Sequence, residues 1–304
     1  MLDIHAHLFW KSYDTDRDVV IERARAAGVT KMICVGTEPE DNPLAIKMAE
    51  KYEGVFAAVG IHPHFFNKNI FLCHSREGGN PGNKENSGSR VKPGMTVLEG
   101  LVNDLKKLAK HARVVAIGEC GLDYYSHDKT KVITDEQKAL QKEGFLAQIE
   151  IAQELGLPLI VHTRPSVGSM DAYADVLKIL RDTKYMIHNT VLHCYQGDTE
   201  ITKKFLELEN VYFSFAGNIT YPVKGSFVGT KNDATETVKL VLLERLFVET
   251  DCPFLAPQSK RGQRNEPAFV METAEKIASL KGVSVGELNQ RVIENSERVF
   301  RENC

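Results

Sequence analysis

The chain has 304 residues, a formal net charge of -3 and an apolar fraction of 42%. The near-balanced charge excludes the strongly basic composition of proteins that coat DNA, so any nucleic acid would be bound locally, at a site. The length suits one large domain or two ordinary ones, and α/β barrels of this size form a single domain.

Short apolar runs alternate with helix-length segments along the chain. The runs are continuous and rich in Val, Ile, Leu and Phe, which is typical of parallel strands buried on both faces. We predict strands at 2–8, 31–36, 55–62, 114–120, 157–163, 190–195, 211–217 and 246–251, and helices at 16–27, 42–52, 97–111, 135–155, 171–183, 234–243 and 266–281. Eight strands favour an α/β fold of the (β/α)₈ TIM-barrel type over a doubly wound open sheet, which periodicity alone does not exclude.

The clearest helix is predicted at 135–155. It opens with "TDEQ" (134–137), which supplies an N-cap and acidic residues for the first turn. It ends at Gly156, two residues before Pro158, as helices commonly do.

Residues 66–95 do not fit this alternation, because they are rich in Gly, Asn, Ser and Lys and show little periodicity. We interpret them as an insertion after the third strand of a barrel that otherwise spans 1–304 as one domain. The segment "CHSREGGNPG" resembles a translated dispersed repeat element. This favours an insertion that has no function of its own and is tolerated, since loop insertions cost little stability. The alternative is a lid or a flap that contacts DNA.

The six cysteines form no C-x-x-C pair, and most lie in apolar runs. Reduced thiols in a cytoplasmic protein are therefore expected. No apolar run approaches the length of a membrane span, and we expect no signal peptide because the first strand begins at residue 2. No repeated apolar stripe marks an interface, so we expect a monomer.

Histidines and acids stand at the C-terminal ends of several predicted strands. In "DIHAH", His5 and His7 are two residues apart and therefore project to the same side of a strand. The C-terminal ends of barrel strands converge on one face, where active sites form. The other residues at these ends are His62, His64, Glu119, His162, His193 and Asp251.

A single histidine at a strand end is more often a structural residue than a ligand. Burying so many ionisable groups together without a metal would, however, be costly. Imidazoles and carboxylates suit Zn²⁺, Mn²⁺, Fe²⁺ and related divalent ions. The pattern therefore predicts a metal centre, with a carboxylate available to bridge two ions.

Six motifs carry a resemblance to a known family. They are "DIHAH" (3–7), "VGIHPH" (59–64), "AIGECGLDYY" (116–125), "VHTR" (161–164), "LHCYQG" (192–197) and "ETDCPFLAPQSKRGQRNEP" (249–267). Together they resemble the TatD family of metal-dependent deoxyribonucleases, within the amidohydrolase-like barrels. The resemblance covers nearly the whole chain outside 66–95.

The resemblance implies a site with two divalent ions, Mg²⁺, Mn²⁺ or Zn²⁺. His5, His7, Glu119 and Asp251 would hold one ion, and Glu119, His162 and His193 would hold the other, with Glu119 bridging. Asp251 is also a candidate to take the proton from the attacking water. The implied activity is 3′ to 5′ exonuclease action on DNA, with single strands or DNA ends as the partner.

Other residues are candidates for holding the DNA. Arg164 follows His162 by two residues and could pair with a phosphate, while His62 and His64 resemble family positions that line the cleft. Tyr124 and Tyr125 could stack on a base; packing at the barrel rim is their alternative. The loop after the last strand offers Lys260, Arg261, Arg264 and Asn265, for whose cations a solvated loop is the alternative. Cys120, Cys194 and Cys252 each follow a ligand directly and are expected to face away from the cleft.

Two other functions stay open. Related barrels with the same first motif are amidases, lactonases and deacylases, and a relative cleaving aminoacyl-tRNA esters would have nearly the same site. Many of those relatives use a bridging lysine, whereas Glu119 takes that position here. A non-catalytic, decayed barrel is disfavoured by the complete ligand set.

Overall fold

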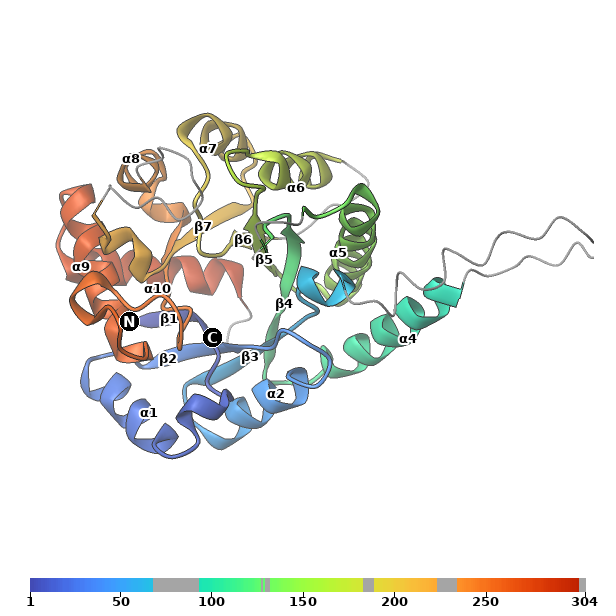
Figure 1. Cartoon of the computed structure of the whole chain (residues 1–304). Coiled ribbons are helices and arrows are strands. Elements are labelled where there is room, and N and C mark those ends of the chain that lie inside the picture. Colours follow the sequence, from blue (N-terminus) through green and yellow to red (C-terminus); the bar gives the residue numbers. More distant parts are fainter. Residues whose placement is uncertain (68–92, 127, 129–131, 183–188, 223–233, 301–304) are drawn as a thin grey trace, which may run out of the picture.

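The computed structural model describes residues 1–67, 93–126, 128, 132–182, 189–222 and 234–300. Eight parallel strands form one sheet in the order β1 to β8, with helices around its outside (Figure 1). The strands are Leu2–Ala6 (β1), Lys31–Val35 (β2), Val55–Val59 (β3), Val114–Asp123 (β4), Leu159–Arg164 (β5), Thr190–Leu192 (β6), Val211–Phe215 (β7) and Leu246–Val248 (β8). The predicted (β/α)₈ barrel is confirmed.

The helices of the outer layer include two that were not predicted, α7 and α10. Both begin at a side chain that caps the helix: Asp198 accepts a hydrogen bond from the Ile201 amide, and Ser284 accepts one from the Glu287 amide. The α-helices are Arg17–Ala26 (α1), Asn42–Lys51 (α2), Pro93–Leu108 (α4), Asp135–Leu155 (α5), Asp171–Arg181 (α6), Thr199–Leu206 (α7), Ala234–Leu240 (α8), Val270–Lys281 (α9) and Val285–Val299 (α10).

The clearest predicted helix, α5, has the predicted bounds. Thr134 accepts a hydrogen bond from the Gln137 amide while the Gln137 side chain bonds the Thr134 amide, so a complete capping box begins the helix. Gly156 ends it in the left-handed conformation, with φ of 62°.

The first and last strands close the barrel through their C-terminal ends. The Asp251 amide donates to the His5 carbonyl at 2.9 Å, and the His7 amide donates to the Cys252 carbonyl at 2.9 Å. Deeper in the barrel, the Thr250 hydroxyl donates to the buried Asp3 carboxylate at 2.6 Å. These bonds fix the start of the chain beside residues almost 250 positions later.

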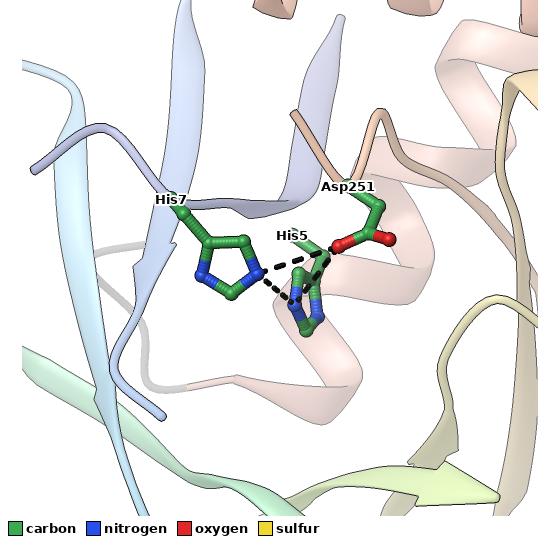
Figure 2. Close-up of side chains that lie close together, drawn as sticks. All are labelled: His5, His7 and Asp251. Carbon is green, nitrogen blue, oxygen red and sulfur yellow. Dashed lines mark hydrogen bonds and ion pairs between the residues drawn. The ribbon is translucent and has the colours of Figure 1, made fainter. Parts of the chain in front are cut away.

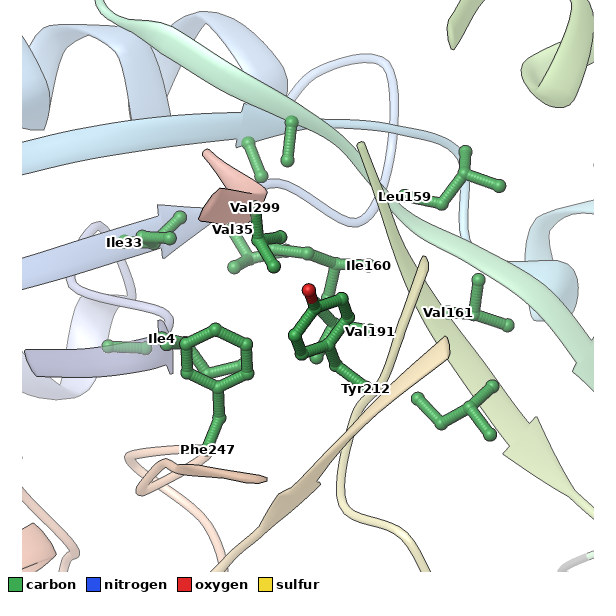
Figure 3. Packing of buried hydrophobic residues seen from close by; sticks show 14 of the residues in the cluster. Ile4, Ile33, Val35, Leu159, Ile160, Val161, Val191, Tyr212, Phe247 and Val299 are labelled. Carbon is green, nitrogen blue, oxygen red and sulfur yellow. The ribbon is translucent and has the colours of Figure 1, made fainter. Parts of the chain in front are cut away.

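The core is apolar toward the N-terminal ends of the strands. The rings of Tyr212 of β7 and Phe247 of β8 lie 5.8 Å apart, and Val299 of α10 belongs to the same buried cluster (Figure 3). Ile160 and Val191, which precede His162 and His193 by two residues, also belong to this cluster. The polar side chains at the C-terminal ends of the strands therefore lie above a layer of buried apolar side chains.

Strand β4 extends beyond its predicted end at Cys120. Residues 120–123 continue the ladder and pair with 161–164 of β5. Gly121 permits this close approach, because a Cβ atom there would lie 2.1 Å from the His162 carbonyl oxygen. The extension places Asp123 beside β5.

The predicted insertion at about 66–95 falls between β3 and β4, and the residues described at both of its ends belong to helical elements. Phe66 belongs to a 3₁₀ turn, Pro63–Asn67, and its buried ring fills the space beside Gly144 of α5. At the other end, α4 already begins at Pro93. Residues 68–92 lie outside the described residues. Within the described parts of the chain, no helix has the length and apolarity needed to cross a membrane.

Candidate metal centre

Strand β1 and the segment after β8 together provide the first candidate ligand group, His5, His7 and Asp251 (Figure 2). The Nε2 atoms of the two histidines lie 3.3 Å apart. Asp251 Oδ1 lies 3.7 Å from His5 Nε2 and 3.4 Å from His7 Nε2. The three donor atoms therefore face one point, as the i, i+2 spacing predicts.

The second candidate group, Glu119, His162 and His193, comes from β4, β5 and the end of β6. Glu119 Oε1 lies 2.9 Å from His162 Nδ1 and 3.0 Å from His193 Nε2. The two ring nitrogens are 3.3 Å apart. This group again offers two imidazoles and one carboxylate.

Glu119 connects the two groups. While its Oε1 faces His162 and His193, its Oε2 lies 3.5 Å from His5 Nε2. The His5 and His193 rings are stacked, with centroids 4.0 Å apart. One carboxylate thus presents one oxygen to each set of donors, which is the arrangement that a bridging ligand requires.

The outer nitrogens of three rings are held by acceptors, so the inner nitrogens are free to bind a metal. His7 Nδ1–H donates to the Val35 carbonyl at 2.8 Å, a direction consistent with Nε2 as the donor atom toward the centre. His162 Nε2 lies 3.0 Å from Asp123 Oδ2, and His193 Nδ1 lies 3.2 Å from Glu249 Oε1. These carboxylates also raise the basicity of the rings.

The centre is electrostatically suited to a cation. Burial alone would raise the pKa of Glu119, but the charge of the neighbouring His193 and hydrogen bonds from His162 and His193 hold it well below its usual value. The pKa of Asp251 is also lowered, against the effect of burial, by its contact with His7. Burial and the adjacent His162 lower the pKa of His62 to about 3, so this ring is neutral.

Among the described residues, the ion pairs of Glu119, Asp123, Glu249 and Asp251 involve histidines only. In the part of the chain that the structure describes, no lysine or arginine is seen in an ion pair with these four carboxylates. Ionised carboxylates and imidazoles are the ligands that divalent transition metals prefer. The donor set therefore fits one or more divalent ions.

A pocket of about 460 Å³ opens over both groups. His62, His64 and Arg164, predicted to contact the substrate, line it. The Arg164 guanidinium lies over the Tyr125 ring, 3.7 Å from its centroid, and this contact restrains the arginine side chain. Tyr124 is buried and donates to Asp175, so for this residue the packing alternative holds.

The four candidates from the loop after β8, which are Lys260, Arg261, Arg264 and Asn265, do not line this pocket. Arg264 forms a bidentate ion pair with Asp16, at 2.6 and 2.9 Å. The Arg261 guanidinium lies over the Tyr221 ring at 4.3 Å. Asn265 is buried and donates to the carbonyls of Thr250 and Phe254. Their roles toward a substrate stay predictions, but in the structure they organise the protein itself.

Cys120 and Cys252 are buried, as expected, whereas Cys194 lines the pocket. The expectation that Cys194 faces away is wrong because β6 ends at Leu192 and strand alternation stops there. Cys194 adopts a positive φ of 44°, which turns it toward the cleft.

Asp123 and Glu249 were not among the predicted site residues, but they contact two candidate ligand histidines. The Asp123 carboxylate accepts a hydrogen bond from the outer ring nitrogen of His162, and the Glu249 carboxylate accepts one from that of His193. Glu249 stands two residues before Asp251, the spacing that also joins His5 to His7, so a period of two would have identified it. Asp123 lies beyond the predicted end of the fourth strand at Cys120, so the pattern of polar residues at strand ends did not include it.

A model of the TatD related DNase family matches residues 2–301. The chain belongs to the TatD family. It is 35% identical over 303 residues to the metal-dependent hydrolase YabD of Bacillus subtilis, with 100% of both chains covered. It is a metal-dependent hydrolase.

Two further TatD relatives frame the comparison. The 3′-5′ ssDNA/RNA exonuclease TatD of Klebsiella pneumoniae is 30% identical, with 99% of this chain and 97% of the relative covered. Among solved structures, the TatD homologue YJJV of Escherichia coli superposes with a TM-score of 0.77 at 24% identity, covering 99% and 97% of the two chains. The second likeness supports the barrel fold.

Proposed function

We propose that this TatD protein hydrolyses phosphodiester bonds of single-stranded DNA from the 3′ end, using two divalent ions. His5, His7, Glu119 and Asp251 would hold one ion, and Glu119, His162 and His193 the other. The observation that carries the proposal is the position of Glu119, whose two oxygens face different donor groups 2.9 to 3.5 Å away.

The protein residues have separate tasks in this reaction. When bound, two divalent ions supply positive charge that stabilises the attacking and leaving oxygens. Arg164, on the pocket wall, would pair with a phosphate and orient it. Asp251 is ionised and reaches the cleft, so it is available to accept the proton of the attacking water. His62, neutral and 3.5 Å from Glu119, would contact the phosphate or position the bridging carboxylate.

Three details of the proposal go beyond the family. The substrate class follows the name of the Klebsiella relative, which acts on single-stranded DNA and RNA. The ions would be Mg²⁺, Mn²⁺ or Zn²⁺, since histidine and carboxylate sites accept several metals and availability decides among them. We further propose a cytoplasmic monomer.

The test uses single-stranded DNA labelled at the 3′ or the 5′ end, incubated with purified protein and Mg²⁺, Mn²⁺, Zn²⁺ or chelator. We expect metal-dependent release of the 3′ label and a ladder of shortened 5′-labelled strands. Glu119→Ala would abolish both, while Glu150→Ala, an exposed glutamate of α5, serves as the matched control.

Cleavage that starts at the 5′ end or within the strand would contradict the proposed direction. No cleavage of DNA or RNA by a folded, metal-loaded protein would contradict the nuclease function. Ester and amide substrates would then be examined, because a deacylase on the same barrel would use the same metal centre.

A further inference from the structure

Two aromatic side chains at the mouth of the metal pocket are exposed. Trp10 is 37% exposed and Phe254 is 44% exposed, and both line the pocket. Their rings meet edge to face, with centroids 5.0 Å apart and planes at 86°. The pair is therefore an apolar corner that is open to solvent on the pocket side.

This corner lies next to the first candidate ligand group. The His7 ring centroid is 6.3 Å from that of Trp10 and 6.2 Å from that of Phe254. A substrate group bound to a metal ion held by His7 and Asp251 would therefore lie close to these two aromatic rings.

The exposure of the two rings does not come from loose loops. Arg17 donates to the carbonyls of Leu8 at 2.7 Å and Trp10 at 3.2 Å, and so holds the backbone that carries the indole. The Phe254 amide donates to the Asp251 carbonyl at 2.9 Å, and the Asn265 side chain donates to the Phe254 carbonyl. Both rings are presented by backbone that is fixed before any ligand arrives.

We propose that Trp10 and Phe254 form a stacking site for an unpaired nucleobase that flanks the scissile phosphate. This rests on the proposed nuclease function. Base–aromatic stacking tolerates every sequence because each base has a π-face. A base inside a duplex has both faces covered by its neighbours, and a terminal base pair leaves only its outer face open, so the site favours a strand whose last bases are unpaired. The pair thereby selects single-stranded ends, while Arg164 and the ions hold the phosphate.

The kinetic test compares Trp10→Leu and Phe254→Leu with the wild type on two oligonucleotides. One is a normal single strand, and the other carries tetrahydrofuran residues in place of its two 3′-terminal nucleosides, so it lacks those bases. On the normal strand, each variant should raise KM about tenfold with little change in kcat, the effect of losing one base–aromatic stack. On the strand without terminal bases, wild type and variants should have the same KM.

The controls separate stacking from folding. Trp10→Phe keeps an aromatic ring and should restore most of the wild-type KM. Leu242→Ala removes an exposed apolar side chain before β8, at the opposite end of the barrel, and should change neither constant. An equal rise in KM on both oligonucleotides would overturn the proposal, because the effect would not involve a base.

Binding is also measurable without cleavage, because Trp10 is the only tryptophan. An oligonucleotide with hydrolysis-resistant phosphorothioate linkages at its 3′ end should quench the fluorescence of Trp10, and its analogue without terminal bases should not. Quenching in a protein that cleaves no nucleic acid would support the stacking site while refuting the proposed function. Equal quenching by both oligonucleotides, or by neither, would overturn the stacking site.

Discussion

Asp123 controls the orientation of one candidate ligand. Its Oδ2 accepts from His162 Nε2 and His64 Nε2, each at 3.0 Å, and its Oδ1 accepts from the Tyr125 amide at 2.9 Å. With Nε2–H held by the carboxylate, His162 keeps Nδ1 directed at Glu119. We therefore expect the residue to act through His162 rather than on the substrate.

We predict that Asp123→Asn lowers the hydrolysis rate roughly 10–100-fold, the usual effect of losing a hydrogen-bond partner of a metal-binding histidine. The amide cannot accept from all three donors, so the His162 ring would rotate or change tautomer. Steady-state kinetics and metal content measure the effect. Asp104→Asn, at an exposed position of α4, is the control. An unchanged rate and unchanged metal content in Asp123→Asn would contradict this role.

The candidate ligands could be predicted from sequence because histidines and acids at the ends of apolar runs are conspicuous. His5, His7, Glu119, His162, His193 and Asp251 all lie in the two groups that share Glu119. Arg264 and Asn265 show the limit of this reasoning. Both are close to Asp251 in sequence, but this does not determine where their side chains point. Arg264 is held by an ion pair with Asp16, and Asn265 is held by hydrogen bonds to buried backbone carbonyls.

At the scale of elements, continuous apolar runs identified all the strands of the sheet, and the errors lie at their ends. The prediction ended β4 at Cys120, whereas pairing with β5 extends it to Asp123. Helix α7 was missed because its Asp198 cap begins only a short helix, Thr199–Leu206. Caps were informative where the helix was long, as in α5.

The loop after β8 is tied to the start of α1 by the ion pair between Arg264 and Asp16. Arg264 lowers the pKa of Asp16 by donating to its carboxylate. A carboxyl whose pKa is lower in the folded state stabilises the fold above its unfolded pKa, and the contribution disappears as the pH falls through the folded pKa.

We therefore predict that Asp16→Asn lowers the free energy of unfolding at pH 7 by about 1 kcal/mol, since the pair is partly exposed. The difference from the wild type should shrink as the pH falls below the ordinary pKa of an aspartate, about 3.9. Urea denaturation at several pH values measures it. A difference that is constant down to pH 3 or grows with acidity would contradict the electrostatic explanation.

At the scale of the molecule, the barrel brings residues between positions 5 and 251 to one face. The parallel order of the strands fixes this convergence, so the sequence could predict which face holds the site. It could not predict the exposed corner of Trp10 and Phe254, because that depends on how the segments after β1 and β8 meet.

We predict that the segment after β3 is dispensable for catalysis. Replacing residues 70–90 by a short Gly/Ser linker should leave the hydrolysis rate within about twofold and the melting temperature nearly unchanged, because surface loop length contributes little to stability. Phe66 and the start of α4 are kept, since Phe66 packs beside Gly144. A large loss of rate with an unchanged melting temperature would favour the lid or flap instead.

The central claim is that Glu119 joins two metal sites, and the metal content of the protein tests it most directly. Wild type and Glu150→Ala, loaded with Mn²⁺ and dialysed, should retain about two ions per chain by elemental analysis. Glu119→Ala should retain fewer, because both ions lose a ligand. One ion or none in the wild type, or two ions in Glu119→Ala, would contradict the bridging role of this carboxylate.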